Sequence, residues 1–177
     1  KSDYKVVAVE YIGIGFSDVS DQARTNENYI SELREALKKS GLNPPYVLMP
    51  HSASGIYAEY YATQYPEEIE AIIMLDTTSS AEPESIKVPS FVYSLGKVQQ
   101  ATGFSRLVSN LVPETKLIEN GYTEKEQADY LLFTYFGGND TVMNQAMLFV
   151  DNIKAVSYTH QTLPTPPTGE ISYRTYP

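Results

Sequence analysis

Short apolar runs alternate with longer amphipathic runs through the first half of the chain. The apolar runs have strand length and are rich in β-branched residues; they cover 4–10, 46–49 and 69–75. The amphipathic runs, 26–40 and 54–65, have the length and spacing of helices. Because strands and helices alternate strictly, this pattern predicts βαβ units and an α/β fold with a parallel sheet of about three strands.

The first helix has recognisable ends in the sequence. Thr25 can cap its first turn with a side-chain oxygen. Ile30, Leu33 and Leu37 form an apolar stripe at helical spacing. Gly41 follows the last helical position, where glycine is preferred because it adopts a left-handed conformation without strain. These signals predict one amphipathic helix over 26–40.

The second half of the chain has a helical pattern and no further strand. A polar, loop-like stretch over 77–89 precedes four expected helices, at about 92–102, 104–111, 123–136 and 139–155. The third begins with a capping box, in which Thr123 and Glu126 are three residues apart. We expect the aromatic residues of this block to pack rather than to bind a ligand; they include Tyr130, Phe133, Tyr135 and Phe136.

Changes of pattern divide the chain into three parts. Residues 1–82 carry the strand–helix alternation, 83–155 form the helical block, and 156–177 lack any period while proline recurs. We expect the last part to be an irregular, largely exposed tail. Its beginning, Val-Ser-Tyr-Thr-His-Gln-Thr-Leu-Pro-Thr, resembles a translated sequencing adapter, with Gln161 as one departure. We therefore expect the natural sequence to end near Ala155.

Composition narrows the possible chemistry. The 177 residues carry a net charge of −9, which disfavours nucleic acids and anionic membrane surfaces as partners. The chain has no cysteine, so disulfides, thiolate catalysis and cysteine-type zinc sites are excluded within it. No apolar run reaches the roughly 18 residues that a membrane span needs. The chain starts at Lys1 rather than at methionine, and we expect it to be an internal piece of a longer protein.

Candidate chemistry is concentrated where the second strand ends. The segment 46–55 reads Tyr-Val-Leu-Met-Pro-His-Ser-Ala-Ser-Gly: an apolar strand, a cluster of small residues, and then a helix. A serine at such an apex is typical of a nucleophile elbow, which needs compact residues two positions to either side. Ser52 is flanked in this way by Pro50 and Ser54, whereas a nucleophile at Ser54 would place Ile56 in one of the compact positions.

An ordinary strand-to-helix loop is the alternative interpretation of this segment. In that case Ser52 or Ser54 would cap the helix and carry no chemistry. The usual Gly-x-Ser-x-Gly pattern is also altered, with Pro50 at its first small position and Ser54 at its last. Between the two serines we favour Ser52 as the nucleophile.

Three motifs in order resemble the α/β-hydrolase superfamily, specifically its cap-bearing serine hydrolases. Residues 10–17, Glu-Tyr-Ile-Gly-Ile-Gly-Phe-Ser, resemble the family loop Asp-x-x-Gly-x-Gly-x-Ser, with glutamate in place of aspartate. Residues 51–55, His-Ser-Ala-Ser-Gly, resemble the His-Ser-Met-Gly-Gly elbow. Residues 65–69, Tyr-Pro-Glu-Glu-Ile, resemble the step into the next strand. The resemblance covers 4 to about 155, and implies a partial α/β-hydrolase sheet with flanking helices and a helical cap.

The resemblance also implies roles for individual residues. Ser52 would be the nucleophile that attacks an acyl carbonyl. The backbone N–H of Ala53 would be one donor of the oxyanion hole, supported by the dipole of the following helix. The family triad requires an acid and a histidine after the nucleophile in the chain. Asp76, at the end of the third strand, is a possible acid, although a plain strand-end aspartate is the favoured interpretation.

Neither histidine of the chain is a convincing base. His51 is adjacent to Ser52 and is not the base in the family, and His160 falls in the expected tail. The glycine-rich oxyanion loop before the first strand is not recognisable, nor are the later strands that carry the acid and base. We therefore expect base and oxyanion loop to lie outside these residues.

The predicted function follows from these roles. We expect a piece of a serine hydrolase that acts on a small-molecule ester or similar acyl bond and is inactive by itself. The family chemistry needs no metal or organic cofactor. Serine rather than aspartate at position 52 argues against haloalkane dehalogenase and epoxide hydrolase chemistry. A non-catalytic binding protein on the same fold is the first alternative. A nucleotide-binding α/β domain is the second, although no phosphate-binding glycine motif opens a helix.

The order of the strands in the sheet is a separate expectation. Strands 46–49 and 69–75 should pair in parallel, because one helix links them. Whether 4–10 pairs with 46–49 is left open, since in the family another strand lies between these two.

Overall fold

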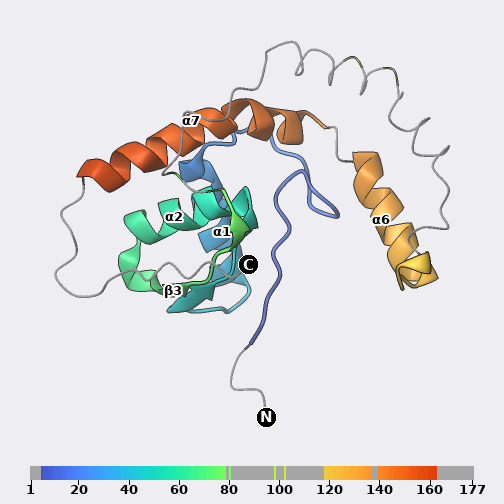
Figure 1. Cartoon of the computed structure of the whole chain (residues 1–177), viewed down its shortest axis with the longest axis horizontal. Coiled ribbons are helices and arrows are strands. Elements are labelled where there is room, and N and C mark those ends of the chain that lie inside the picture. The colour runs from blue at the N-terminus through green and yellow to red at the C-terminus, as the bar shows by residue number, and fades with distance from the viewer. Residues whose placement is uncertain are drawn as a thin grey trace. The chain divides into compact units, whose positions relative to one another are not determined.

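The structure is a computed structural model, and it describes residues 5–78, 80, 98, 102, 118–136 and 139–162. Its elements, in chain order, are α1 (Asn26–Lys39), β1 (Tyr46–Leu48), β2 (His51–Ser52), α2 (Ser54–Gln64), the 3-10 helix η1 (Pro66–Glu68), β3 (Ile69–Ile72), β4 (Leu75–Thr77), α6 (Glu124–Phe136) and α7 (Asp140–Thr162) (Figure 1).

The chain forms two compact units. The first joins Lys1–Ala23 to Val88–Met147, and the second joins Arg24–Lys87 to Leu148–Pro177. The four strands found among the described residues belong to the second unit, together with α1 and α2. In the part of the chain that the structure describes, no helix is both long enough and apolar enough to cross a membrane.

The strands form two parallel pairs. β1 pairs with β3 and β2 pairs with β4. The strand expected over 69–75 is interrupted between β3 and β4, and β2 is an additional short strand beyond the one expected over 46–49. Two backbone hydrogen bonds connect the pairs: the N–H of Ile73 donates to the carbonyl of Leu48 (2.8 Å) and that of Leu75 donates to Pro50 (3.0 Å). The expected parallel pairing of 46–49 with 69–75 is confirmed.

The expected strand over 4–10 is not formed. Residues 5–10 have no regular structure, and Val6 is 91% exposed. A buried parallel strand requires a hydrogen-bonded neighbour and cover on both faces. Among the described residues this segment has neither, so its β-branched composition alone does not make it a strand. The described residues therefore form two pairs of strands instead of one sheet of about three strands.

Helices α1 and α2 agree with the sequence. Thr25 accepts a hydrogen bond from the N–H of Asn28 (3.2 Å), and Gly41 follows α1 with a φ of +68°. The two helices pack against each other, with the rings of Tyr29 and Tyr57 stacked at 4.0 Å between centroids. α2 ends before Pro66. Helix α2 in turn packs against β2, β3 and β4, the strands on either side of the turn at Ser52.

Helix α7 is longer than the sequence predicts. It continues to Thr162, so the irregular tail expected from 156 onward is wrong up to that point. The reason is packing: Ile153 and Val156 are fully buried against Ile56 of α2, with Phe149 alongside. Nothing between 156 and 162 breaks a helix, because the first proline follows at Pro164. Residues beyond 162 lie outside the described part of the chain.

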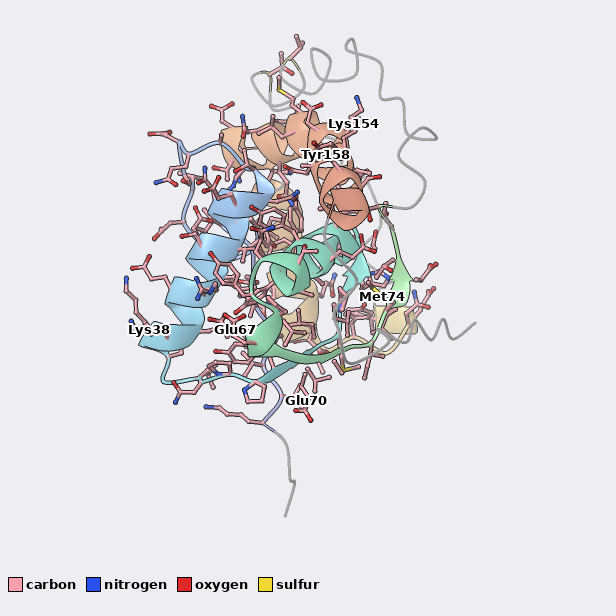
Figure 2. The ribbon with its side chains drawn as sticks, turned by 90° about the vertical axis from the view of Figure 1, so that its left-hand side faces the viewer. Lys38, Glu67, Glu70, Met74, Lys154 and Tyr158 are labelled. Atoms are coloured by element: carbon pink, nitrogen blue, oxygen red, sulfur yellow. The ribbon has the colours of Figure 1, made fainter. Side chains whose placement is uncertain are left out.

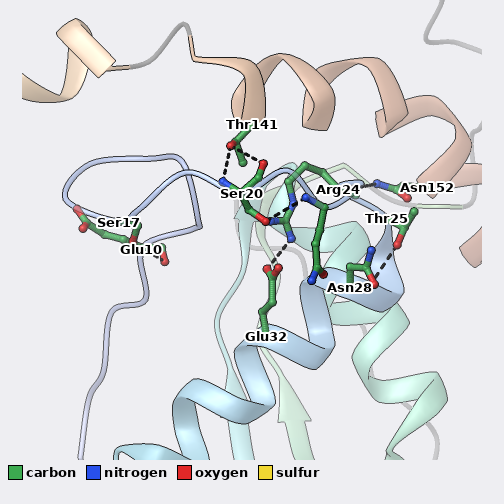
Figure 3. A network of polar contacts seen from close by, with 10 residues as sticks. Glu10, Ser17, Ser20, Arg24, Thr25, Asn28, Glu32, Thr141 and Asn152 are labelled. Carbon is green, nitrogen blue, oxygen red and sulfur yellow. Dashed lines mark hydrogen bonds and ion pairs between the residues drawn. The ribbon is translucent and has the colours of Figure 1, made fainter.

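The exposed side of α7 confirms this orientation. Lys154 and Tyr158 are both exposed (Figure 2). On the buried side, the side chain of Asn152 accepts a hydrogen bond from the N–H of Asn26 (3.1 Å) and donates one to the carbonyl of Arg24 (2.9 Å). Arg24 in turn forms an ion pair with Glu32 at 2.5 Å (Figure 3). The second half of α7 is thus tied to the start of α1.

Within the first unit, α6 begins as expected. The N–H of Thr123 donates to the Glu126 carboxylate (2.8 Å), and the N–H of Glu126 donates back to the Thr123 hydroxyl (3.3 Å), which completes the capping box. The helices expected over 92–102 and 104–111 lie outside the described residues, except that Val98 and Thr102 are helical. Of the four aromatic residues expected to pack, only the side chain of Tyr130 is described; it is about half exposed.

A charged cluster joins α1, α2 and η1. The Arg34 guanidinium donates to both carboxylate oxygens of Glu68 (3.0 and 2.6 Å) and lies 3.6 Å from the ring centroid of Tyr65. The hydroxyl of Tyr61 donates to the same carboxylate (2.7 Å). The Arg34 hydrogen bonds hold the pKa of the Glu68 carboxyl below its ordinary value of 4.5, although partial burial opposes the shift. This cluster anchors η1, which leads directly into β3.

The cluster predicts a specific dependence of stability on pH. Because the folded-state pKa of Glu68 is lowered, its stabilisation is complete above the ordinary pKa and is lost as the pH falls through the folded value. We expect Glu68→Gln to lower the free energy of unfolding by about 1 kcal/mol at about pH 7, and by less under acid. Urea unfolding of the wild type and of Glu68→Gln, at neutral and at acidic pH, measures this difference in the free energy of unfolding. The control is Glu67→Gln, an exposed neighbour (Figure 2), and an equal loss in both variants would contradict the role of the cluster.

Candidate active site at the strand-to-helix turn

Ser52 lies at the apex of a sharp turn between β2 and α2. Its φ is +53°, one of two positive values among the non-glycine residues that the structure describes. A residue with a Cβ atom pays a strain cost of about 1 kcal/mol or more in this conformation. The residue is exposed, and α2 begins two positions later, at Ser54. Strain, exposure and a following helix are the geometry that places a side chain clear of the sheet.

The first turn of α2 does not support the capping alternative. The N-cap residue is Ala53, with φ −56° and ψ −23°, and no side-chain hydrogen bond caps this helix. Alanine has no side-chain acceptor, so neither serine acts as the N-cap. The backbone of Ala53 starts the helix next to Ser52, which is the position that the resemblance assigned to an oxyanion donor.

Gly55 allows the helix to approach the neighbouring strand closely. A Cβ atom at this position would lie 2.5 Å from the carbonyl oxygen of Thr78 and 2.7 Å from the Cβ of Thr77. The elbow pattern requires a compact residue at Ser54, and the structure shows a close approach one residue later, at Gly55. A glycine inside a helical run is a signal that could have indicated it.

Asp76 is the second strained residue of the site. Its φ is +45°, and its side chain is exposed. His51 is opposite Leu75 and Ser52 is opposite Thr77, so Asp76 is the extra residue of a bulge in β4. From the sequence, a plain strand-end aspartate is favoured over an acid of the site, and no sequence signal indicates a strained bulge.

The segment after Asp76 is fixed to the elbow by its backbone. The N–H of Thr78 donates to the carbonyl of Ser52 (3.0 Å). The N–H of Ser80 donates to the carboxylate of Glu59 (3.1 Å), and Glu59 is only 4% exposed. Buried carboxylates need such donors, because an unpaired buried charge is costly. Glu59 was not identified from the sequence, where it reads as one polar residue in a helix.

The two histidines have different settings. His51 precedes Ser52 in β2 and is exposed. His160 falls in the last turns of α7, and its side chain lies outside the described residues.

The glycine loop at 10–17 is closed on itself within the first unit. The Glu10 carboxylate accepts a hydrogen bond from the N–H of Phe16 (3.1 Å), and Gly13 and Gly15 have φ values of +87° and +58°. A Cβ at Gly15 would overlap the Glu10 carboxylate. Glutamate thus closes this loop at the position where the family motif has aspartate. Further along, the Thr141 hydroxyl contacts the backbone N–H and C=O of Ser20 (Figure 3).

The chain has the α/β-hydrolase fold. It matches an epoxide hydrolase, CorEH, with a TM-score of 0.51 and 15% identity, over 84% of this chain and 56% of that one. A putative lipase from Acinetobacter baumannii gives a TM-score of 0.51 and 20% identity, over 85% and 52%. A haloalkane dehalogenase, DatA from Agrobacterium tumefaciens, gives 0.51 and 14%, over 89% and 59%. At these identities the likeness concerns the fold alone.

Sequence relatives are few and partly uncharacterised. The chain is 35% identical over 133 residues to the uncharacterized protein YbdG of Bacillus subtilis, covering 71% of this chain and 39% of that protein. It is 27% identical over 92 residues to a cis-3-alkyl-4-alkyloxetan-2-one decarboxylase of Shewanella oneidensis, over 50% and 29%. No family model matches the chain. The chain therefore spans well under half the length of these relatives.

Proposed function

We propose that this chain carries the nucleophile of a serine hydrolase that cleaves an ester or similar acyl bond. The observation that carries the proposal is the positive φ of Ser52, exposed at the turn from β2 into α2. A serine does not adopt a positive φ at the end of a β-strand unless the surrounding structure imposes it. The likeness in fold to an esterase-type scaffold supports the class of reaction by analogy only.

The mechanism assigns one role to each group at the turn. The Ser52 Oγ attacks the acyl carbonyl carbon while a base accepts its proton, and the carbonyl oxygen becomes an oxyanion. The backbone N–H of Ala53 donates to that oxyanion, and the N-terminal end of α2 adds a favourable field. The C–O bond to the leaving alcohol breaks, and the alcohol takes the proton from the base. Water then hydrolyses the acyl-serine.

A hydroxyl nucleophile separates this proposal from the chemistry of some proteins with the same fold. An alkyl-enzyme intermediate forms when a carboxylate at the apex of the elbow is the nucleophile. Here the apex residue is Ser52, which carries a hydroxyl. We therefore propose acyl transfer rather than opening of an epoxide or displacement of a halide.

The base is proposed to come from outside these residues. His51 is adjacent to Ser52 in the chain, and the side chain of His160 lies outside the described residues. The matched segments cover only 39% and 29% of two of the relatives, which leaves room in such proteins for a base and for a second oxyanion donor. The 177 residues by themselves are therefore expected to hydrolyse esters very slowly.

Hydrolysis of p-nitrophenyl acetate tests whether Ser52 acts together with a base from outside these residues. The full-length protein that contains these residues should release p-nitrophenol in a burst with a stoichiometry of about one per Ser52, because the acyl-enzyme forms faster than it breaks down. The 177-residue polypeptide should give no burst and no turnover above buffer. Turnover by the 177-residue polypeptide would contradict the proposal that the base comes from outside these residues. A full-length protein that binds esters without cleaving them would favour a binding function on the same fold.

A further inference from the structure

Glu59 is a buried carboxylate that the proposed mechanism does not use. It lies on α2, the helix that begins just after Ser52, and it is only 4% exposed. Its Oε2 atom accepts a hydrogen bond from the N–H of Ser80 (3.1 Å), and Ser80 is itself 5% exposed. Burial of a carboxylate costs free energy even where donors satisfy it, because the group gives up its hydration. An apolar side chain would fill the same space without that cost, so packing alone does not account for a carboxylate here.

The carboxylate lies on the face of α2 that contacts the chain after β4. Gly55 and Glu59 are one helical turn apart and therefore share a face. Gly55 lies against the backbone of Thr78, where an added Cβ atom would approach the carbonyl oxygen to 2.5 Å. Glu59 binds the backbone of Ser80. The helix thus holds this segment in two ways, by close approach at Gly55 and by a hydrogen bond at Glu59.

The same segment is bonded to the turn that carries Ser52. The N–H of Thr78 donates to the carbonyl of Ser52 (3.0 Å). Ser52 has a φ of +53°, and strain of this kind persists only where the surrounding contacts over-determine the conformation. Because Thr78 and Ser80 are close in the chain, the carboxylate that holds Ser80 also restrains the backbone of the strained serine.

We propose that Glu59 is a positioning residue for the Ser52 nucleophile. Its carboxylate holds the segment that contains Thr78 and Ser80, and that segment holds the turn. The inference rests on the proposed function, because it concerns where the nucleophilic oxygen lies relative to the acyl carbonyl. Glu59 acts through the backbone and not by contact with the substrate. A misplacement of reacting atoms by about 1 Å can cost about 100-fold in rate, so loss of this anchor slows the attack without removing a reacting group.

Glu59→Leu and Glu59→Gln separate anchoring from packing. Leucine has no acceptor, so the buried N–H of Ser80 loses the carboxylate, and the segment is expected to shift toward water. Glutamine keeps an oxygen on the same carbon and still accepts the N–H. The full-length protein is treated with a fluorophosphonate, and the rate of labelling is measured against reagent concentration. For Glu59→Leu we expect the limiting rate constant to fall by about 10- to 100-fold, with the half-saturating concentration changed by less than about threefold. For Glu59→Gln we expect both values within about threefold of the wild type.

Glu70→Leu is the matched control for this substitution. Glu70 is an exposed glutamate of β3 (Figure 2), so its replacement should leave the rate constant and the half-saturating concentration unchanged. The melting temperature of every variant is measured in parallel. Glu59→Ala is a second variant for the case in which Glu59→Leu does not fold, because the space it leaves admits water to the Ser80 N–H. The anchor is still lost, so the same fall in the rate constant is expected.

The outcomes distinguish the two proposals. A Glu59→Leu protein that melts at a lower temperature but is labelled at the wild-type rate would overturn the positioning role. Equal losses in Glu59→Leu and Glu59→Gln would also overturn it, because glutamine retains the acceptor. With Ser52→Ala unlabelled, either result leaves the nucleophile intact. Labelling of Ser52→Ala at the wild-type rate would overturn the proposed function itself, and the role of Glu59 with it. Slow labelling of Glu59→Leu, together with wild-type labelling of Glu59→Gln, supports the assignment.

Discussion

Ser52→Ala is expected to lower kcat of the full-length protein toward p-nitrophenyl esters by about 10⁴- to 10⁶-fold. The substitution removes the oxygen that is proposed to attack the substrate, and it leaves the backbone N–H groups of the turn in place. Alanine keeps a Cβ atom, so the strain of φ +53° remains and the fold should be little affected. Steady-state kinetics and a thermal melt of the same preparation measure the two effects separately.

Ser54→Ala is the matched control for this experiment. Ser54 is two residues away, carries the same hydroxyl, and is the first residue of α2 rather than the apex. Its replacement should change kcat by less than about tenfold. Alanine is the best helix former, so α2 and the turn before it should stay intact. If Ser54→Ala were the inactive variant and Ser52→Ala the active one, the position of the nucleophile would be wrong.

Gly55→Ala is expected to destabilise the protein by about 2 kcal/mol or more. The new methyl group would lie 2.5 Å from the carbonyl oxygen of Thr78, which is backbone and cannot rotate away. Helix propensity alone predicts the opposite sign, since Ala stabilises a helix interior over Gly by about 1 kcal/mol. The sign of the change in unfolding free energy therefore tells which effect dominates. Urea denaturation of the two proteins measures it.

Gln64→Ala controls for helix propensity in the same helix. Gln64 is the exposed last residue of α2, so its replacement should change stability by less than about 0.5 kcal/mol. A Gly55→Ala protein that is more stable than the wild type would show that α2 can move away from β4. The close packing that fixes Asp76 beside the elbow would then be incorrect.

Local signals in the sequence were sufficient to predict the ends of helices and the position of the turn. Thr25 and Gly41 define the ends of α1 because caps depend on neighbouring residues only. The capping box at Thr123 is found for the same reason. Ser52 could be chosen over Ser54 because a strand-to-helix turn imposes compact residues at fixed offsets. Its positive φ agrees with that choice, while its chemistry stays a proposal.

Features that depend on distant partners could not be predicted. The β-branched run at 4–10 fits a buried strand, but strand formation requires neighbours that the described residues do not supply. Helix α7 extends to Thr162 because Val156 packs on Ile56, a contact between residues 100 positions apart. The bulge at Asp76 and the buried partner of Ser80 likewise depend on register and on packing across elements. No pattern within one segment encodes them.

If Ser52 is a covalent nucleophile, a fluorophosphonate should become trapped on its side-chain oxygen. The full-length protein would be treated with the reagent, digested, and mapped by mass spectrometry. We expect a stoichiometric adduct on the peptide that contains Ser52, and none in Ser52→Ala. An adduct on another residue, or an unmodified Ser52 in a protein that still hydrolyses esters, would contradict it.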